Sequence, residues 1–131
     1  MTTLAPASVA QWRAWLEEHA TTAREVWLVL PRKGSGLPGL RYDEAVEQAL
    51  CFGWIDSLAR SRDEASSLLR FSPRRPTSRW SASNVERVRR LTEQGQMTPA
   101  GQALIDLAKA RGTWPREADG APWVDRSATG G

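Results

Sequence analysis

Residues 42–73 read YDEAVEQALCFGWIDSLARSRDEASSLLRFSP, and the spacing of their hydrophobic residues changes halfway along. From Tyr42 onward, apolar residues recur at the three-and-four spacing of an amphipathic helix, which Gly53 is placed to end. The two segments that follow, WIDSLAR and ASSLLRFSP, have the length and composition of strands, and RSRDE between them is typical of a hairpin turn. This stretch therefore predicts a helix followed by a hairpin of two strands.

The N-terminal part predicts one helix and one strand. Ser8 and Gln11 have the spacing of a capping box, and the apolar residues after Ser8 predict an amphipathic helix over residues 9–19. Residues 25–31, EVWLVLP, form a short apolar run of strand type, which Pro31 places at a strand end or a sheet edge. The loop RKGSGLPGL leads from this strand to the next helix.

Two more helices are predicted after the hairpin. The first begins near Ser81 or Ser83 and ends at Gly95, and the second begins with Thr98 as its cap and ends before Gly112. Together these elements predict an α+β fold, in which a small, mostly antiparallel sheet of about three strands packs with about four helices.

The length of 131 residues allows one compact domain with a real core. We expect a single globular domain over residues 1–112 and a loosely ordered tail over residues 113–131, unless Trp114 or Trp123 packs on the domain. No apolar run is long enough to span a bilayer, and the N-terminus does not resemble a signal peptide, so a cytoplasmic location is predicted. The single cysteine, Cys51, fits a reducing compartment and is expected to be part of the core.

The positive charge is concentrated in the middle of the chain. Residues 60–90 contain nine arginines and three acidic residues, whereas the whole chain has a net charge of only +3. Such a segment favours contact with an anion, such as a phosphate, a nucleic acid or an acidic partner. A solvated face is the alternative, because Glu86 and Arg90, like Arg89 and Glu93, have the i, i+4 spacing of ion pairs within a helix.

The sequence offers little support for a cofactor, a metal or a familiar catalytic motif. Gly34, Gly36 and Gly39 match G-x-G-x-x-G, but Pro38 and the residues after it separate them from any helix, so a flexible loop is the better interpretation. One cysteine and one histidine cannot build a Cys/His zinc site, and no serine lies in G-x-S-x-G. We therefore expect no cofactor, no metal and no catalytic residue.

Four segments have a distinctive order and spacing: WLVLPRKGSG, YDEAVEQALCFGWIDS, RFSPRRPTSRWSASNVERV and GQMTPAG. They resemble the bacterial YdeI/OmpD-associated family, also called bacteriocin-protection proteins, over about residues 10–114. The resemblance implies an α+β fold, mostly no assigned reaction, and a role in envelope stress or in tolerance of cationic peptides. Typical members continue into a further helical part with an arginine-rich end, which this sequence does not match. The family provides no catalytic residues, and its motif positions here are Lys33, Gly53, Trp54, Ile55, Asp56, Pro73, Arg74, Trp80, Ser81 and Asn84.

The hairpin brings the turn at Gly53 towards the stiff proline segment that carries Arg74, if the strands pair as a meander. Asp56 and Arg74 would then form a bidentate ion pair between two tryptophans. In a structural interpretation this pair ties the turn to the proline segment, with the tryptophans as core. In a functional interpretation the same region is a tryptophan-walled anion pocket at a helix N-terminus. The candidate ligand-binding residues are Lys33, Trp54, Asp56, Arg74, Arg75, Trp80, Ser81 and Asn84.

Three classes of function remain open on the sequence. The favoured one is a non-enzymatic, stress-related binding or adaptor domain for a small anionic ligand or a protein partner. The alternative is a weak binder of single-stranded nucleic acid that uses residues 60–90 together with tryptophan stacking. The third is an enzyme with Asp56 as general base, which the surrounding arginines disfavour.

Overall fold

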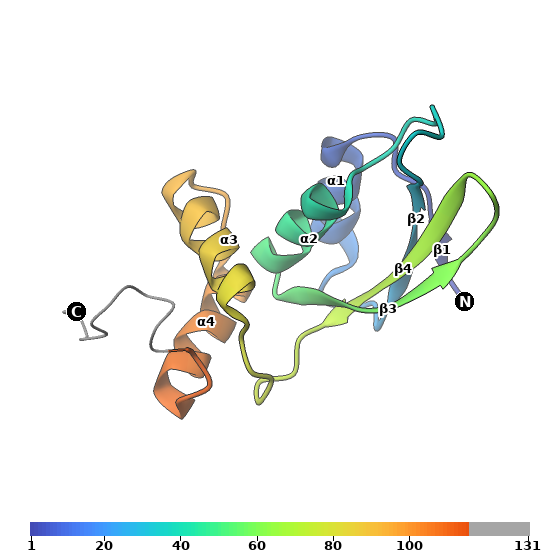
Figure 1. Cartoon of the computed structure of the whole chain (residues 1–131). Coiled ribbons are helices and arrows are strands. Elements are labelled where there is room, and N and C mark those ends of the chain that lie inside the picture. The colour runs from blue at the N-terminus through green and yellow to red at the C-terminus, as the bar shows by residue number, and fades with distance from the viewer. Residues whose placement is uncertain (116–131) are drawn as a thin grey trace.

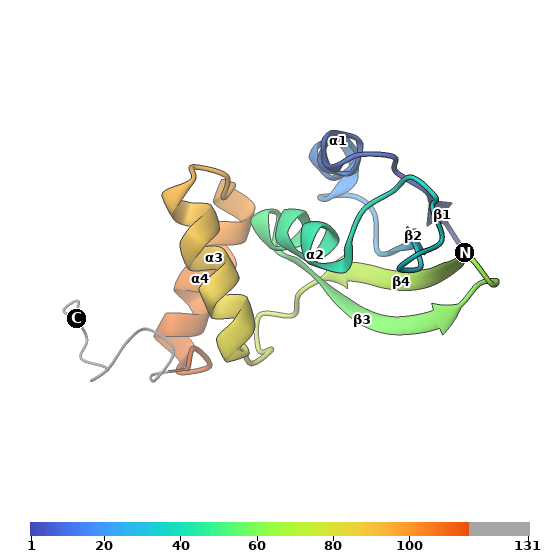
Figure 2. The same ribbon diagram turned by 45° about the horizontal axis from the view of Figure 1, so that its top comes forward.

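The computed structural model describes residues 1–115, which form a sheet covered on one face by helices (Figure 1). In chain order the elements are β1 (Thr3–Leu4), α1 (Val9–His19), β2 (Val26–Pro31), α2 (Tyr42–Cys51), β3 (Trp54–Ser61), β4 (Ser66–Pro73), α3 (Ala82–Glu93) and α4 (Pro99–Arg111). The α+β class and the small, mostly antiparallel sheet packed with four helices are confirmed. In Figures 1 and 2, α1 and α2 lie over the sheet, while α3 and α4 lie side by side beyond α2.

The sheet has the strand order β1-β2-β4-β3. Strand β4 pairs antiparallel with both β2 and β3, as the hairpin prediction requires, whereas β1 pairs parallel with β2 through Thr3 and Leu4. The sequence predicts about three strands, so β1 is the additional one. A strand of two residues has no alternation of side chains to detect, and only its partner in β2 defines it.

Alternation along the strands gives the sheet an inner and an outer face. Val26 and Phe71 are paired residues on the inner face, where they are fully buried with Trp12 of α1 and Val46 of α2. The outer face is the one that carries Trp27 and the arginines of β3 and β4, since Trp27 pairs with Arg70. Within residues 1–115 no helix covers this face in the views of Figures 1 and 2.

The β3–β4 ladder contains a β-bulge. Asp56 pairs with Phe71 and Ala59 pairs with Leu69, so Ser57 and Leu58 together lie opposite the single residue Arg70. A bulge of this kind bends the strand and redirects a side chain. Here it places the Ser57 hydroxyl where it accepts a hydrogen bond from Arg70 Nη1 at 3.0 Å.

The predicted helix ends agree closely with the structure. Helix α1 spans residues 9–19, with the Ser8 side chain accepting a hydrogen bond from the Gln11 N–H. Of the two candidate starts for α3, Ser81 is the cap. Thr98 caps α4, and Gly112 ends it in the left-handed region. Side chains within one turn of a helix decide these ends, which is why local sequence predicts them.

Helix α4 crosses the C-terminal end of α2 at very close range. The backbone of Gly101 lies against the carbonyl groups of Leu50 and Cys51, and the Thr98 hydroxyl donates to the Cys51 carbonyl oxygen at 2.5 Å. Cys51 itself is fully buried, in agreement with its expected place in the core, and burial raises the pKa of its thiol. The absence of a side chain at Gly101 therefore sets how closely the two helices approach.

The charged face of α3 forms ion pairs that the helical spacing did not predict. Arg87 bonds to Asp43 and Arg90 bonds to Glu47, in both cases across to α2. The predicted partner of Arg90, Glu86, instead bonds to Arg89. The i, i+4 prediction for Arg90 was wrong because the neighbouring helix presents a carboxylate at hydrogen-bond distance.

The structured chain continues past the predicted domain end at residue 112. Trp114 is only 6% exposed and belongs to the hydrophobic core, with its ring centroid 5.3 Å from that of Trp80. The backbone N–H of Trp80 donates to the Thr113 carbonyl oxygen at 3.2 Å. Trp123 and most of the predicted tail lie outside the described residues. None of the helices in residues 1–115 is long and apolar enough to cross a membrane.

Candidate functional site

The turn after α2 and the proline segment are neighbours, as the meander predicts. The N–H of Arg74 donates to the Gly53 carbonyl oxygen at 2.8 Å, and Trp54 pairs with Pro73 in the ladder. Gly53 has a φ of 79°, which suits glycine, and a Cβ there would meet Leu104 of α4. The backbone part of the prediction is therefore correct.

The predicted ion pair between Asp56 and Arg74 is wrong. Asp56 Oδ2 accepts a hydrogen bond from the Tyr42 hydroxyl at 3.0 Å. Arg74 Nη2 donates to the Arg79 carbonyl oxygen at 2.8 Å, and no ion pair joins Arg74 to a carboxylate of residues 1–115. The ladder explains the separation: Asp56 lies opposite Phe71, three residues before Arg74, which is about 10 Å along a strand.

Arg74 is a buried cation that packs on an aromatic ring. It is 7% exposed, and its guanidinium carbon lies 4.0 Å from the centroid of the Trp80 ring. Burial lowers the pKa of Arg74, yet an arginine remains charged at physiological pH. The ring face and the Arg79 carbonyl together stabilise this charge where a carboxylate was expected.

Four other predicted residues have structural roles. Trp54 is 1% exposed and donates through Nε1 to the Ala20 carbonyl oxygen, and Trp80 is buried in the core. Ser81 accepts a hydrogen bond from the Asn84 N–H, and the Asn84 side chain accepts one from Arg87. The two tryptophans thus have the core position of the structural interpretation, and Ser81 has the role of a helix cap.

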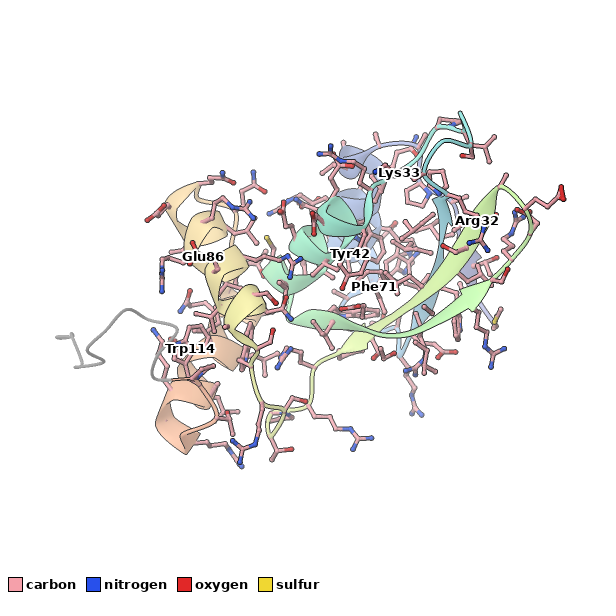
Figure 3. All side chains as sticks on the ribbon, in the orientation of Figure 1. Arg32, Lys33, Tyr42, Phe71, Glu86 and Trp114 are labelled. Carbon is pink, nitrogen blue, oxygen red and sulfur yellow. The ribbon has the colours of Figure 1, made fainter. Side chains whose placement is uncertain are left out.

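Lys33 lies in a different part of the molecule from the proline segment. It lines a depression together with Tyr42 at the start of α2 and Leu69 of β4, and Figure 3 labels Lys33 on the loop after β2. Arg32 beside it is held by hydrogen bonds to the Asp63 carbonyl and the Ser61 hydroxyl. The eight predicted residues are therefore not gathered in one pocket.

Arg75 lines a second depression, which we call the arginine–serine depression. It opens on the outer face of the sheet, where the proline segment meets the end of the loop before β2, and it has a volume of about 520 Å³. Its lining residues are Ala23, Arg24, Ile55, Ser57, Arg70, Ser72, Pro73, Arg75 and Ser78.

The polar groups of this depression are mostly hydrogen-bond donors. Arg70 is paired with Glu25 and also donates to Ser57. Arg24 and Arg75 have no hydrogen bond or ion pair from their side chains to any of residues 1–115. Three guanidinium groups with a single neighbouring carboxylate leave an excess of positive charge, which suits an oxyanion.

Of these lining residues, only Arg75 was predicted from the sequence to bind a ligand, while Ile55 and Pro73 are motif positions of the family resemblance. Arg70 and Ser72 alternate on one strand, so their common face could have been found from the strand prediction. Ser57 reaches the same place only through the bulge, and Arg24 comes from a segment that is distant in sequence. No local pattern connects these last two residues.

The described residues that line this depression can bind a ligand, but they do not include a catalytic base. The lining residues include serines and arginines but no histidine, aspartate or glutamate to act as a base. Residues 1–115 also contain no group of three or more His, Cys, Asp or Glu side chains that could hold a metal.

The fold and the depression define a small α+β domain with a cationic surface site. The chain belongs to the family described as a domain of unknown function, DUF8412, whose model matches residues 4–104. The matched range contains the whole arginine–serine depression and ends within α4. Comparison with curated proteins and with solved structures found no match.

Proposed function

We propose that this protein is a non-enzymatic binding domain whose arginine–serine depression holds a phosphate or a similar oxyanion. The observation that carries the proposal is the position of Arg24 and Arg75, two guanidinium groups from distant segments that line one depression without an acidic partner in residues 1–115. A guanidinium left without a counter-ion has strong donors available for a phosphate.

The shape and composition of the depression support the same ligand. Its volume is in the range of ordinary small-molecule sites, and Ile55 and Pro73 add apolar surface beside the donors. Ser72 and Ser78 contribute hydroxyl groups that can donate to further oxygens. The ligand therefore has an anionic group and a body large enough to contact the apolar wall.

The role in stress adaptation stays a prediction from the YdeI/OmpD-associated resemblance. A binding domain that recognises an anionic metabolite or an acidic partner is compatible with that resemblance, and it requires no catalytic residue. A cytoplasmic location and an oxyanion as the ligand are both part of this proposal.

The experiment that tests the proposal is isothermal titration of the full chain with inorganic phosphate and pyrophosphate at low salt. Arg24→Gln and Arg75→Gln should each weaken pyrophosphate binding by about tenfold, the effect of losing a charge-assisted hydrogen bond. Lys33→Gln is the matched control, because it removes one positive charge from the other depression. Equal binding by the wild type and an Arg24→Gln/Arg75→Gln double variant would refute the proposal.

A second candidate function is the binding of single-stranded nucleic acid. It is favoured by Arg60, whose guanidinium lies 5.3 Å from the ring centroid of Trp27 on the same outer face. An oligonucleotide could then contact Arg60 and the depression together, with affinity that falls steeply with salt. Arg60→Gln would weaken oligonucleotide binding but leave pyrophosphate binding unchanged. If it weakens neither, this candidate is excluded.

A further inference from the structure

A groove between α3 and α4 has features of a second binding site. We call it the α3–α4 groove: it has a volume of about 230 Å³ and is lined by Val85, Val88, Arg89, Thr92, Glu93, Gln102, Ile105, Lys109 and Trp114. Figure 3 shows Trp114 beside the two helices, at the end away from the sheet. Its lining residues differ from those of the arginine–serine depression throughout.

One residue that lines this groove, Trp114, has a buried polar atom without a hydrogen-bond partner in the described part of the chain. The indole Nε1 of Trp114 is buried and has no hydrogen-bond acceptor in the described part of the chain. Two other buried tryptophans, Trp12 and Trp54, donate to the carbonyl oxygens of Ala45 and Ala20. An unmade hydrogen bond of a buried N–H costs free energy, so a ligand that brings an acceptor to Trp114 would remove that cost.

The charges on the rim favour a negative acceptor. Lys109 Nζ lies 5.0 Å from the ring centroid of Trp114 and has no ion pair with residues 1–115. Arg89, which is paired with Glu86, also lines the groove, and Glu93 is the only acidic residue of the lining. Below the rim, Val85, Val88 and Ile105 provide apolar side chains that are almost fully buried. The groove therefore combines an apolar floor with a cation and an unpaired donor.

We propose that the α3–α4 groove binds a small carboxylate that has an aromatic or branched aliphatic body. The body packs on the apolar floor, one carboxylate oxygen accepts the Trp114 Nε1–H bond, and Lys109 neutralises the charge. This site does not depend on the oxyanion site, because no residue lines both.

The test uses the indole N–H signals of the ¹⁵N-labelled full chain and phenylacetate as the probe. The Trp114 signal, assigned with Trp114→Phe, should move downfield as its proton gains an acceptor. The signals of Trp12 and Trp54 should stay in place because their protons are already bonded. A fragment of this size is expected to bind with a dissociation constant of about 1 mM.

Two comparisons distinguish recognition of the carboxylate in this groove from nonspecific hydrophobic binding and from binding at the oxyanion site. Lys109→Met keeps most of the apolar stem and should weaken phenylacetate binding about tenfold without weakening the neutral 2-phenylethanol. Arg75→Gln should leave phenylacetate binding unchanged, which distinguishes this site from the oxyanion site. The proposal is overturned if the Trp114 signal does not respond, or if Lys109→Met binds phenylacetate as tightly as the wild type. The comparison of Lys109→Met with the wild type does not use Trp114→Phe, so it remains valid if that variant does not fold.

Discussion

The guanidinium of Arg74 lies 4.0 Å from the ring centroid of Trp80, and its Nη2 donates to the carbonyl oxygen of Arg79. This contact uses a buried charge to hold the proline segment against the start of α3. It also means that Asp56, which bonds to Tyr42, has no direct part in that attachment.

The first prediction separates these two residues by their effects on stability. Arg74→Ala should lower the free energy of unfolding by about 2 kcal/mol, because it removes a buried cation–π contact and leaves a carbonyl without its donor. Asp56→Asn should change it by less than about 0.5 kcal/mol, as is usual at a partly exposed position. Urea denaturation of both variants measures the two values.

The double variant then tests whether the residues are coupled. Residues without shared partners are expected to be additive within about 0.5 kcal/mol. A coupling energy between Arg74 and Asp56 well above this limit would restore the ion pair that the sequence suggested. Arg74→Lys, which keeps the charge but not the planar guanidinium, should fall between the wild type and Arg74→Ala.

The second prediction concerns Tyr42, the only tyrosine of the chain. Partial burial raises the pKa of Tyr42, and the neighbouring Asp56 carboxylate raises it further. The folded protein therefore holds this proton more tightly than the unfolded chain. The stabilisation is fully present below the unfolded pKa near 10 and is lost as the pH rises through the folded pKa.

Absorbance of the phenolate reports the titration of Tyr42 without interference from another tyrosine. Asp56→Asn should move its pKa part of the way back towards 10.0, because burial is the larger cause and stays in place. A titration that is identical in the wild type and in Asp56→Asn would show that the Tyr42–Asp56 hydrogen bond is not formed in solution.

The third prediction tests the close crossing of α2 and α4. A methyl group at residue 101 would lie 2.9 Å from the Leu50 carbonyl oxygen and nearer still to that of Cys51. Gly101→Ala should therefore lower stability by about 1–3 kcal/mol, although alanine is the better helix former. The matched control is Ala103→Gly in the same helix, where the expected loss is about 1 kcal/mol from propensity alone. Thermal unfolding of both variants decides between crowding and propensity.

The fourth prediction concerns the ion pairs that join α3 to α2. Neutralising Asp43 and Glu47 together as Asn and Gln should cost about 1 kcal/mol or less, because one partner of each pair is exposed to solvent. The difference from the wild type should shrink in about 1 M salt, where the screening length is near 3 Å. Glu86→Gln, which affects a pair within α3, serves as the comparison. A loss that is unaffected by salt would argue against a role for these charges.

Much of the fold could be predicted from local sequence. The helix over residues 9–19, the left-handed ends at Gly53 and Gly112, and the caps at Ser81 and Thr98 depend on groups within one turn, so their residues are sufficient to specify them. The hairpin follows from two strand-like runs with a short connection, and it correctly placed Gly53 next to Arg74.

The candidate site was much less predictable, because its groups come from separate segments. The partner of Arg90 is on α2, and the partner of Asp56 is the tyrosine at the start of that helix. The arginine–serine depression depends on a bulge at Ser57 and on the approach of Arg24 to the proline segment. The sequence by itself determined the helices, the hairpin and the excess of arginine. Only the tertiary structure decided which arginines are neutralised and which line an open surface, because Coulomb and hydrogen-bond energies depend on distances in space and not along the chain.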